Sequence, residues 1–187
     1  MPIIISAGDN AEFVAFCGIN LDITIFNKEE VYLPAFIKTY PFLNVEVENK
    51  DKKVNSLIAI DNNPKYVAKD KKIFILDKEK NLSKQTASKV ELIKELNSQR
   101  AVCRRIIAEL KKLDLLIKKD LRVKIEGKEE KVILEEFYVI NMEKLLKLDD
   151  KIIASFAKKG WMGIFDAHLK SISNFEKVLK ANKTNVK

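Results

Sequence analysis

The chain has 187 residues, of which 47% are hydrophobic and 33% charged, and its formal net charge is +8. Such a chain can bury a core without disulfides, and its length is that of one domain. No apolar run approaches the roughly 20 residues that a membrane-spanning helix requires, which excludes an integral membrane protein. The N-terminus lacks the layout of a secretory signal, so we expect a cytoplasmic protein, with peripheral association with the cell envelope as the alternative.

Strand signals fill the first eighty residues. Short runs rich in Ile, Val and Phe alternate with turn-forming clusters, which is typical of a meandering antiparallel sheet. The predicted strands are PIIIS (2–6), EFVAFCGI (12–19), DITIF (22–26), EVYLPAF (30–36), FLNVEVE (42–48), NSLIAI (55–60) and KKIFIL (71–76). Because proline cannot donate to a strand ladder, Pro41 should lie at a strand start, an edge or a bulge.

From Ser83 the hydrophobic period becomes helical. Ser83 is suited to an N-cap, and apolar residues recur at three- and four-residue spacings as far as Ile117, which predicts one long amphipathic helix with a break allowed near residues 97–98. The alternating segment 122–140 then predicts a β-hairpin with Gly127 in its turn.

The C-terminal region is predicted to be helical. MEKLLKL (142–148) is a short helix, Asp149 caps another that ends at Gly160, and Trp161 begins a final helix that runs to about residue 181. The expected fold is therefore an α+β domain over residues 1–182, with an antiparallel sheet from the N-terminal half packed against the long helix and a C-terminal helical layer. Residues 183–187 form a polar tail that we expect to fray.

Motifs for several kinds of chemistry are absent. There is no glycine-rich phosphate loop and no GxSxG nucleophile motif, and we expect no cofactor. One histidine and two distant cysteines do not supply a zinc site, so we expect no metal. The cysteines, Cys17 and Cys103, have apolar neighbours and are interpreted as reduced structural thiols.

Four stretches carry a resemblance to a known family. They are YLPAFIKTYPF (32–42), SLIAID (56–61), FYVINMEKLLKL (137–148) and KKGWMGIFDAHLKSISNFEKV (158–178). In order and spacing the chain resembles the SapC family of bacterial proteins, which are associated by name with surface-layer (S-layer) biology. Members usually carry a further N-terminal segment, so we expect a short form. The resemblance implies a cell-surface or export context and brings no catalytic residue or ligand with it.

One aromatic and proline-rich segment is a candidate for partner binding. It consists of Tyr32, Pro34, Phe36, Tyr40, Pro41 and Phe42. An edge strand of this composition can add an extended peptide, whose side chains then enter aromatic pockets. The packing alternative is a rigid edge strand folded onto the sheet. Trp161 is a further candidate anchor, since tryptophan is enriched at interface hot spots, or else a core residue between two helices.

A basic ridge is a second candidate site. Arg104, Lys111 and Lys118 recur at every seventh residue, and Arg105, Lys112 and Lys119 form a parallel row. On one helix this spacing would align each row, so the ridge could follow phosphates on nucleic acid or an anionic lipid surface. The alternative is an ordinary solvated face.

His168, the only histidine, lies on the apolar face of the final predicted helix. We interpret it mainly as a buried side chain with a hydrogen-bond partner, and a ligand, pH-sensing or general-base role is the alternative. The leading hypothesis is thus a non-enzymatic accessory protein that binds a protein or peptide, followed by an anionic-polymer binder and then by an enzyme that uses His168. The sequence does not predict an oligomeric state.

Overall fold

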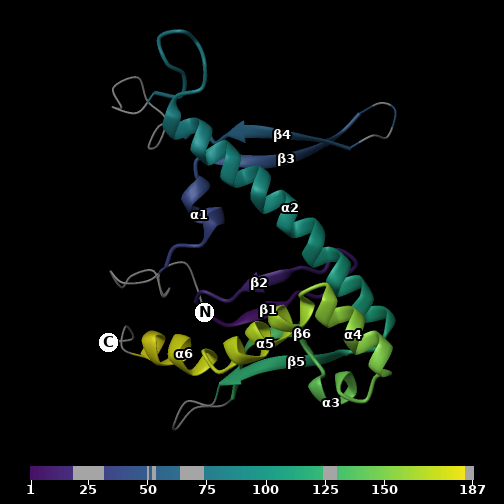
Figure 1. The fold of residues 1–187 in the computed structure, drawn as a ribbon. Coiled ribbons are helices and arrows are strands. Elements are labelled where there is room, and N and C mark those ends of the chain that lie inside the picture. The colour runs from purple at the N-terminus through teal and green to yellow at the C-terminus, as the bar shows by residue number, and fades with distance from the viewer. Residues whose placement is uncertain (19–31, 50, 52–53, 64–73, 124–129, 184–187) are drawn as a thin grey trace. The chain divides into compact units, whose positions relative to one another are not determined.

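The computed structural model describes residues 1–18, 32–49, 51, 54–63, 74–123 and 130–183, shown as the coloured ribbon in Figure 1. The chain divides into two compact units. Unit 1 comprises residues 1–31 and 101–187, and unit 2 comprises residues 32–100. The predicted strand at residues 22–26, the turn at Gly127 and residues 184–187 of the tail lie outside the described residues. With an antiparallel sheet and several helices, the chain has the predicted α+β fold.

Unit 1 contains a four-stranded antiparallel sheet in the order β2-β1-β6-β5. Its strands are β1 (Ile3–Ile5), β2 (Phe13–Ala15), β5 (Leu116–Val123) and β6 (Lys131–Ile140). The predicted hairpin at 122–140 is confirmed as the pairing of β5 with β6, although β5 begins six residues earlier than predicted. The register shifts between Lys119 and Arg122, so β5 carries a bulge.

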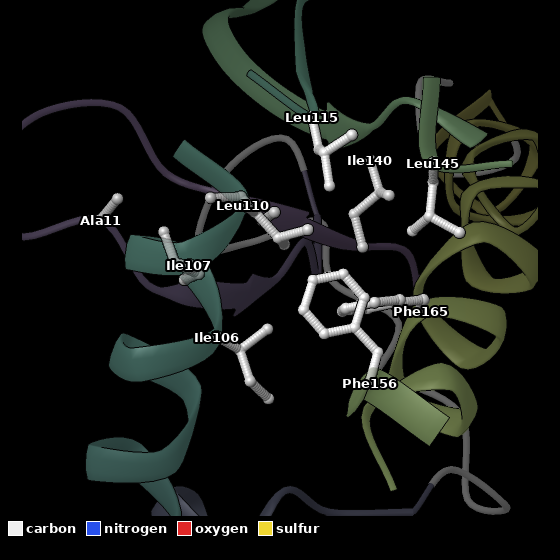
Figure 2. Close-up of a cluster of buried hydrophobic side chains, with 10 residues drawn as sticks. Ala11, Ile106, Ile107, Leu110, Leu115, Ile140, Leu145, Phe156 and Phe165 are labelled. Atoms are coloured by element: carbon white, nitrogen blue, oxygen red, sulfur yellow. The ribbon is translucent and has the colours of Figure 1, made fainter. Parts of the chain in front are cut away.

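The main core of unit 1 lies where this sheet meets its helices. Figure 2 shows the cluster, in which Phe156 and Phe165 are 1% exposed. Its buried members are Ile5, Ala11, Ile106, Ile107, Leu110, Leu115, Ile140, Leu145, Phe156 and Phe165. Because successive strand residues point to opposite faces, Ile4 joins a second cluster with Phe137 and Phe175 on the other face of the sheet. Each fully buried side chain of this size contributes about 1.5–3 kcal/mol, so these two layers stabilise the unit.

The long helix α2 (Lys84–Lys112) runs without a break through residues 97–98 and ends earlier than the predicted limit near Ile117. Asp114 has a left-handed conformation with φ +54°. Leu115 N–H donates to the Leu110 carbonyl over 2.9 Å and Asp114 N–H donates to the Lys111 carbonyl over 3.1 Å. This is the Schellman pattern, and the buried pair of Leu110 and Leu115 provides its usual hydrophobic contact. Glycine normally marks such a helix end, but here the residue is an aspartate. The sequence therefore carried no stop signal, and the predicted helix was extended beyond Lys112 to Ile117.

Four helices complete unit 1, namely α3 (Met142–Leu145), α4 (Asp150–Lys158), α5 (Trp161–Ile172) and α6 (Phe175–Lys183). Asp149 caps α4 by accepting from Lys151 N–H, and Gly160 follows α4 with φ +73°, both as predicted. The single final helix was wrong, because α5 ends at Ile172. Ser171 and Ser173 hydroxyls donate to carbonyls three residues earlier, and such bonds compete with the helix.

Unit 2 contains the helix α1 (Ala35–Thr39), a two-stranded antiparallel sheet and the first part of α2. The sheet pairs β3 (Phe42–Glu48) with β4 (Val54–Ile60), close to both predicted strands. The predicted strand EVYLPAF was wrong where it is described, because Pro34 opens α1: its carbonyl accepts from the N–H groups of Ile37 and Lys38. Proline is well suited to a helix start, where its missing N–H costs no hydrogen bond. In the next predicted strand, KKIFIL, Leu76 forms an isolated antiparallel bridge with Leu82.

Ser83 precedes α2 and caps it, as predicted. Its hydroxyl oxygen accepts from Thr86 N–H over 3.3 Å. No helix in the described part of the chain combines the length and apolar character needed to cross a membrane.

Candidate partner-binding surface

His168 is buried in unit 1, where its side chain accepts a hydrogen bond at a point where β1 and β6 do not pair. β1 and β6 pair at Ile5 and Tyr138, and the same register would place Ile3 opposite Ile140. At that point α5 provides the acceptors instead: Ile140 N–H donates to His168 Nε2 over 3.3 Å, and Ile3 N–H donates to the Ser171 hydroxyl over 2.8 Å. Two side chains of α5 therefore accept from the backbone N–H groups that are not paired between β1 and β6 at this point.

The surroundings of the His168 ring favour its neutral form. The side chain is 1% exposed, and the Phe13 ring meets it edge-on with the ring centres 5.7 Å apart. Burial lowers the pKa of His168, and a backbone interaction with Ile3 opposes this effect without cancelling it. Because Nε2 accepts, the proton lies on Nδ1, which has no partner of good hydrogen-bonding geometry within the described residues. The ring is thus a structural acceptor, in line with the packing interpretation.

The Tyr40–Pro41–Phe42 triplet makes packing and hydrogen-bond contacts within unit 2. Phe42 is only 7% exposed. The hydroxyl of Tyr40 donates to the carboxylate of Asp61, and its carbonyl accepts from Lys89 Nζ over 2.5 Å. Partial burial lowers the pKa of Lys89. Pro41 follows a cis peptide bond and directly precedes β3, as predicted for a proline at a strand start.

The earlier half of the aromatic segment is different, because it is exposed. Tyr32 and Phe36 are each 67% exposed, and Leu33 and Ile37 beside them are exposed as well. These four residues, Tyr32, Leu33, Phe36 and Ile37, are called the α1 surface below. Lys38 Nζ lies 4.1 Å from the centre of the Tyr32 ring, and no acidic residue occurs between Tyr32 and Tyr40. Pro34 is half-buried at the start of α1.

Exposed apolar side chains are concentrated in unit 2. Among the described residues, twelve of the fifteen exposed large hydrophobic side chains belong to unit 2, whereas only Phe42 and Ile93 of its hydrophobic residues are buried. The hairpin contributes Val45, Val47, Leu57, Ile58 and Ile60 to this exposed set. This concentration of exposed apolar side chains makes unit 2 the candidate partner-binding part of the chain.

Trp161 belongs to unit 1 and is half-buried against the main core. Its ring stacks on Phe156 with centres 5.5 Å apart and an interplanar angle of 28°. Lys159 Nζ lies 4.6 Å from the Trp161 ring centre. These contacts explain Trp161 as a packing residue after Gly160, in a different unit from the α1 surface.

The predicted basic ridge is divided between two kinds of element. Arg104, Arg105, Lys111 and Lys112 lie on α2, whereas Lys118 and Lys119 lie on β5, because α2 ends at Lys112. The prediction that both rows follow one helix was therefore wrong.

Three of these cations also have partners within unit 1. Arg104 forms an ion pair with Glu12 at 2.8 Å, and Lys111 Nζ donates to the Gly8 carbonyl over 2.8 Å. Lys118 pairs with Glu136 at 2.5 Å.

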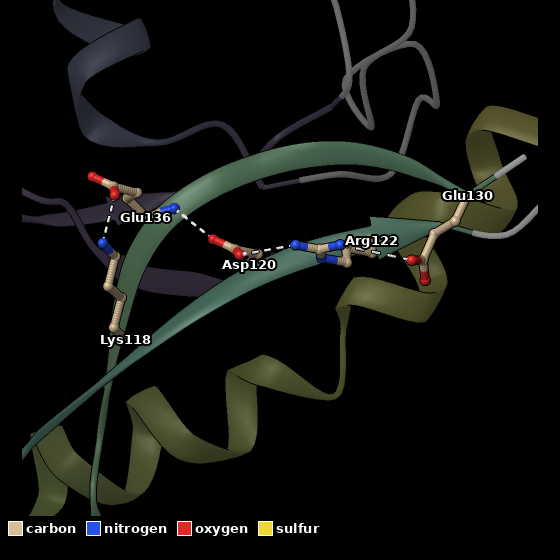
Figure 3. A network of polar contacts seen from close by, with 5 residues as sticks. All are labelled: Lys118, Asp120, Arg122, Glu130 and Glu136. Carbon is tan, nitrogen blue, oxygen red and sulfur yellow. Dashed lines mark hydrogen bonds and ion pairs between the residues drawn. The ribbon is translucent and has the colours of Figure 1, made fainter.

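Charged side chains also cover β5, as Figure 3 shows. Asp120 accepts from the N–H of Glu136, which has φ +53°, and this bond lowers the pKa of the Asp120 carboxyl. Arg122 lies between Asp120 and Glu130, with N–O distances of 3.5 and 3.8 Å. All of these side chains are well exposed, and pairs of this kind contribute at most about 1 kcal/mol each. The arrangement holds the bulge of β5 and protects the edge of the sheet.

The remaining polar candidates do not form a reactive centre. Cys17 and Cys103 are free, and burial raises the pKa of both thiols, which disfavours the reactive thiolate. Across the part of the chain that the structure describes, no group of three or more His, Cys, Asp or Glu residues could hold a metal ion.

Sequence reasoning found Tyr32 and Phe36 but missed Leu33, Ile37 and the exposed hairpin residues. The available signal was that Leu33 and Ile37 belong to the same short apolar stretch, in which Lys38 is the only charged residue before Tyr40. In the hairpin the signal was a strand, NSLIAI, without any charge.

Comparison with known families extends over nearly the whole chain. The SapC family model matches residues 1–178. Comparisons with curated proteins and with solved structures give no match. The chain belongs to the SapC family.

Proposed function

We propose that this SapC-family chain is a non-enzymatic accessory protein that holds a protein partner through the α1 surface. The observation that carries the proposal is the 67% exposure of both Tyr32 and Phe36 on a unit that buries little of its apolar surface. Aromatic side chains with few rotatable bonds are enriched at protein interfaces and provide large contact areas. The name of the family connects this role with bacterial surface-layer or export processes.

Charge near the α1 surface indicates the chemistry of the partner. Lys38 is the only charged residue between Tyr32 and Tyr40, and residues 32–100 contain fourteen Lys and Arg against nine Asp and Glu. A protein segment with apolar anchor side chains and neighbouring acidic residues complements this surface. Since α1 has only five residues, it offers little length to lie in a membrane interface, which favours a protein over a lipid surface.

The test is a purification from the native bacterium at moderate salt, with tagged wild type, a Tyr32→Ser/Phe36→Ser variant and a control. Leu146→Ser is the matched control, because Leu146 is 63% exposed and lies in unit 1 just after α3. The captured protein is then purified and titrated into each variant by calorimetry. We expect the double variant to bind at least about thirtyfold more weakly, since a hot-spot side chain is worth about 2 kcal/mol or more. The melting temperature should stay unchanged.

Two results would refute the proposal. One is a partner that the Tyr32→Ser/Phe36→Ser variant binds as tightly as wild type does, and the other is equal weakening by Leu146→Ser. Capture of nucleic acid or anionic lipid that is lost steeply with rising salt would instead support the anionic-polymer alternative.

A further inference from the structure

Among the described residues, the strand β4 (Val54–Ile60) pairs with β3 alone and carries none of the usual features that prevent edge pairing. It contains no charged residue, proline or glycine, and Asn55, Ser56, Leu57, Ile58 and Ile60 are all exposed. Its ladder with β3 is regular over seven pairs, and no other described strand pairs with it. A long, regular, uncharged edge of this kind is a template for pairing with a further strand.

The other sheet of the same chain protects its edges. β5 carries Lys118, Lys119, Asp120 and Arg122 together with a bulge, and β2 has only three residues. Charges, bulges and short length are the usual means of preventing edge pairing. β4 lacks all of these features. Its neighbour β3 is also protected, because it carries Glu46 and Glu48.

The direction of the free hydrogen-bonding groups on β4 follows from the ladder. Asp61 N–H donates to the Pro41 carbonyl over 2.9 Å, just beyond the pair of Phe42 and Ile60. Hydrogen-bonded pairs alternate along an antiparallel ladder, so Leu57 directs its N–H and C=O toward Val45. The backbone groups of residues 54, 56, 58 and 60 consequently point away from β3.

We infer that β4 pairs antiparallel with β4 of a second copy of this chain, about a two-fold axis at Leu57. This register places residue 56 opposite 58 and residue 54 opposite 60, so each outward-pointing N–H of β4 meets a C=O of the second copy and each C=O meets an N–H. Leu57 then faces Leu57 of the second copy as a pair without hydrogen bonds. The product is a continuous four-stranded sheet with the order β3-β4-β4-β3.

The side chains agree with the same register. One face of the hairpin carries Leu43, Val45, Val47, Asn55, Leu57 and Ala59, all uncharged and all but Asn55 apolar, because paired residues share a face. Pairing about Leu57 keeps that face on the same side in both copies, which doubles one uncharged and mostly apolar surface. A second copy is favoured over a foreign strand because β4 offers no charge for a different partner to complement, and two identical uncharged strands place no like charges opposite each other.

Cysteine cross-linking tests the register directly. In a Cys17→Ser/Cys103→Ser background, Leu57→Cys should form a disulfide-linked dimer on mild oxidation, because facing residues of a pair without hydrogen bonds have Cα atoms about 4.5 Å apart. Asn55→Cys is the control. In this register its equivalents are offset by four residues, or about 13 Å along the strand, which is too far for a disulfide.

Sedimentation of the wild-type chain at about 0.15 M salt, where repulsion from the net charge of +8 is largely screened, tests the association itself. We expect a dimer that Leu57→Lys weakens by at least about tenfold, a change equivalent to roughly 1.4 kcal/mol. The monomer fold should tolerate this substitution, since Leu57 is 54% exposed. Val47→Lys, on the same face but not on β4, should dimerise more tightly than Leu57→Lys does.

A monomeric wild type at high concentration, or equal cross-linking at positions 55 and 57, would overturn the inference. A complex in which β4 is covered by a different protein while the chain remains monomeric would overturn it as well. This inference is independent of the proposed function, because the Tyr32→Ser/Phe36→Ser variant should remain a dimer and Leu57→Lys should retain the α1 surface.

Discussion

Replacing His168 by leucine tests how α5 completes the sheet of unit 1. Leucine fills a similar volume but cannot accept the hydrogen bond from Ile140 N–H. A buried donor left without a partner costs about 1–3 kcal/mol, and loss of the edge-on contact with Phe13 adds roughly 0.5–1.5 kcal/mol. Because leucine also buries additional apolar surface, we expect a net loss of about 2–3 kcal/mol. For a chain of this length that corresponds to a fall in Tm of roughly 4–12 °C.

The pH dependence gives the same variant a second readout. Burial lowers the pKa of His168 in the folded chain, whereas the unfolded chain retains a pKa of about 6.5. The unfolded chain therefore binds the proton more readily, and stability falls as the pH decreases through the window from about 6.5 down to the lowered folded pKa. The slope cannot exceed about 1.4 kcal/mol per pH unit for one proton. His168→Leu should lose this component of the pH dependence.

Urea unfolding between pH 5.5 and 7.5, followed by tryptophan fluorescence, measures both effects. Trp161 is the only tryptophan and packs against the main core, and His168 is the only histidine, so the fluorescence signal and the imidazole titration each belong to one residue. His168→Gln is the control, because its side-chain oxygen can take the place of Nε2 and should recover part of the loss. The reasoning is refuted if His168→Leu is as stable as wild type at pH 7.5, or if it keeps the full pH dependence.

Further substitutions test other parts of the fold by thermal or urea unfolding. Asp149→Ala should cost about 1 kcal/mol by removing the cap of α4, and an unchanged stability would contradict that role. Gly160→Ala should cost roughly 1–2 kcal/mol because φ is +73° there, although space for a methyl group exists. Asp114→Gly should gain up to about 1 kcal/mol by relieving the left-handed residue at the end of α2, because its ion pair with Lys144 is well exposed and adds little, and a loss of stability would contradict this. Phe42→Ala should cost about 3–5 kcal/mol, whereas Phe36→Ala should leave the midpoint unchanged, and equal effects would contradict the division of the aromatic segment.

Local signals predicted much of the fold. Ser83, Asp149 and Gly160 each act through hydrogen bonds or backbone angles within a few residues, so their roles could be read from residue type and spacing. The strands β3 and β4 followed from their composition and from the turn residues that flank them.

The errors arose where a nonlocal or less common device decides the structure. The end of α2 depends on an aspartate in a left-handed conformation and on the burial of Leu115, and neither is visible in the helical period. Lys118 and Lys119 were consequently placed on a helix, although they lie on β5. α1 was predicted as a strand because Val, Tyr and Phe favour strands, and the helix-starting role of Pro34 was missed.

The candidate site shows the same limit. Composition identified the aromatic segment, but only the structure separates the buried Phe42 from the exposed Tyr32 and Phe36. The role of His168 depended on the opening between β1 and β6, which results from strand pairing across most of the chain length.

Site-specific photo-cross-linking in the native bacterium tests most directly whether the α1 surface holds a protein partner. A photoreactive phenylalanine analogue would replace Phe36 in one strain and Leu146, a well-exposed residue of unit 1, in another. We predict one defined protein adduct from position 36 that is missing from position 146. The absence of an adduct at position 36, or the same adducts from both positions, would contradict the proposed function.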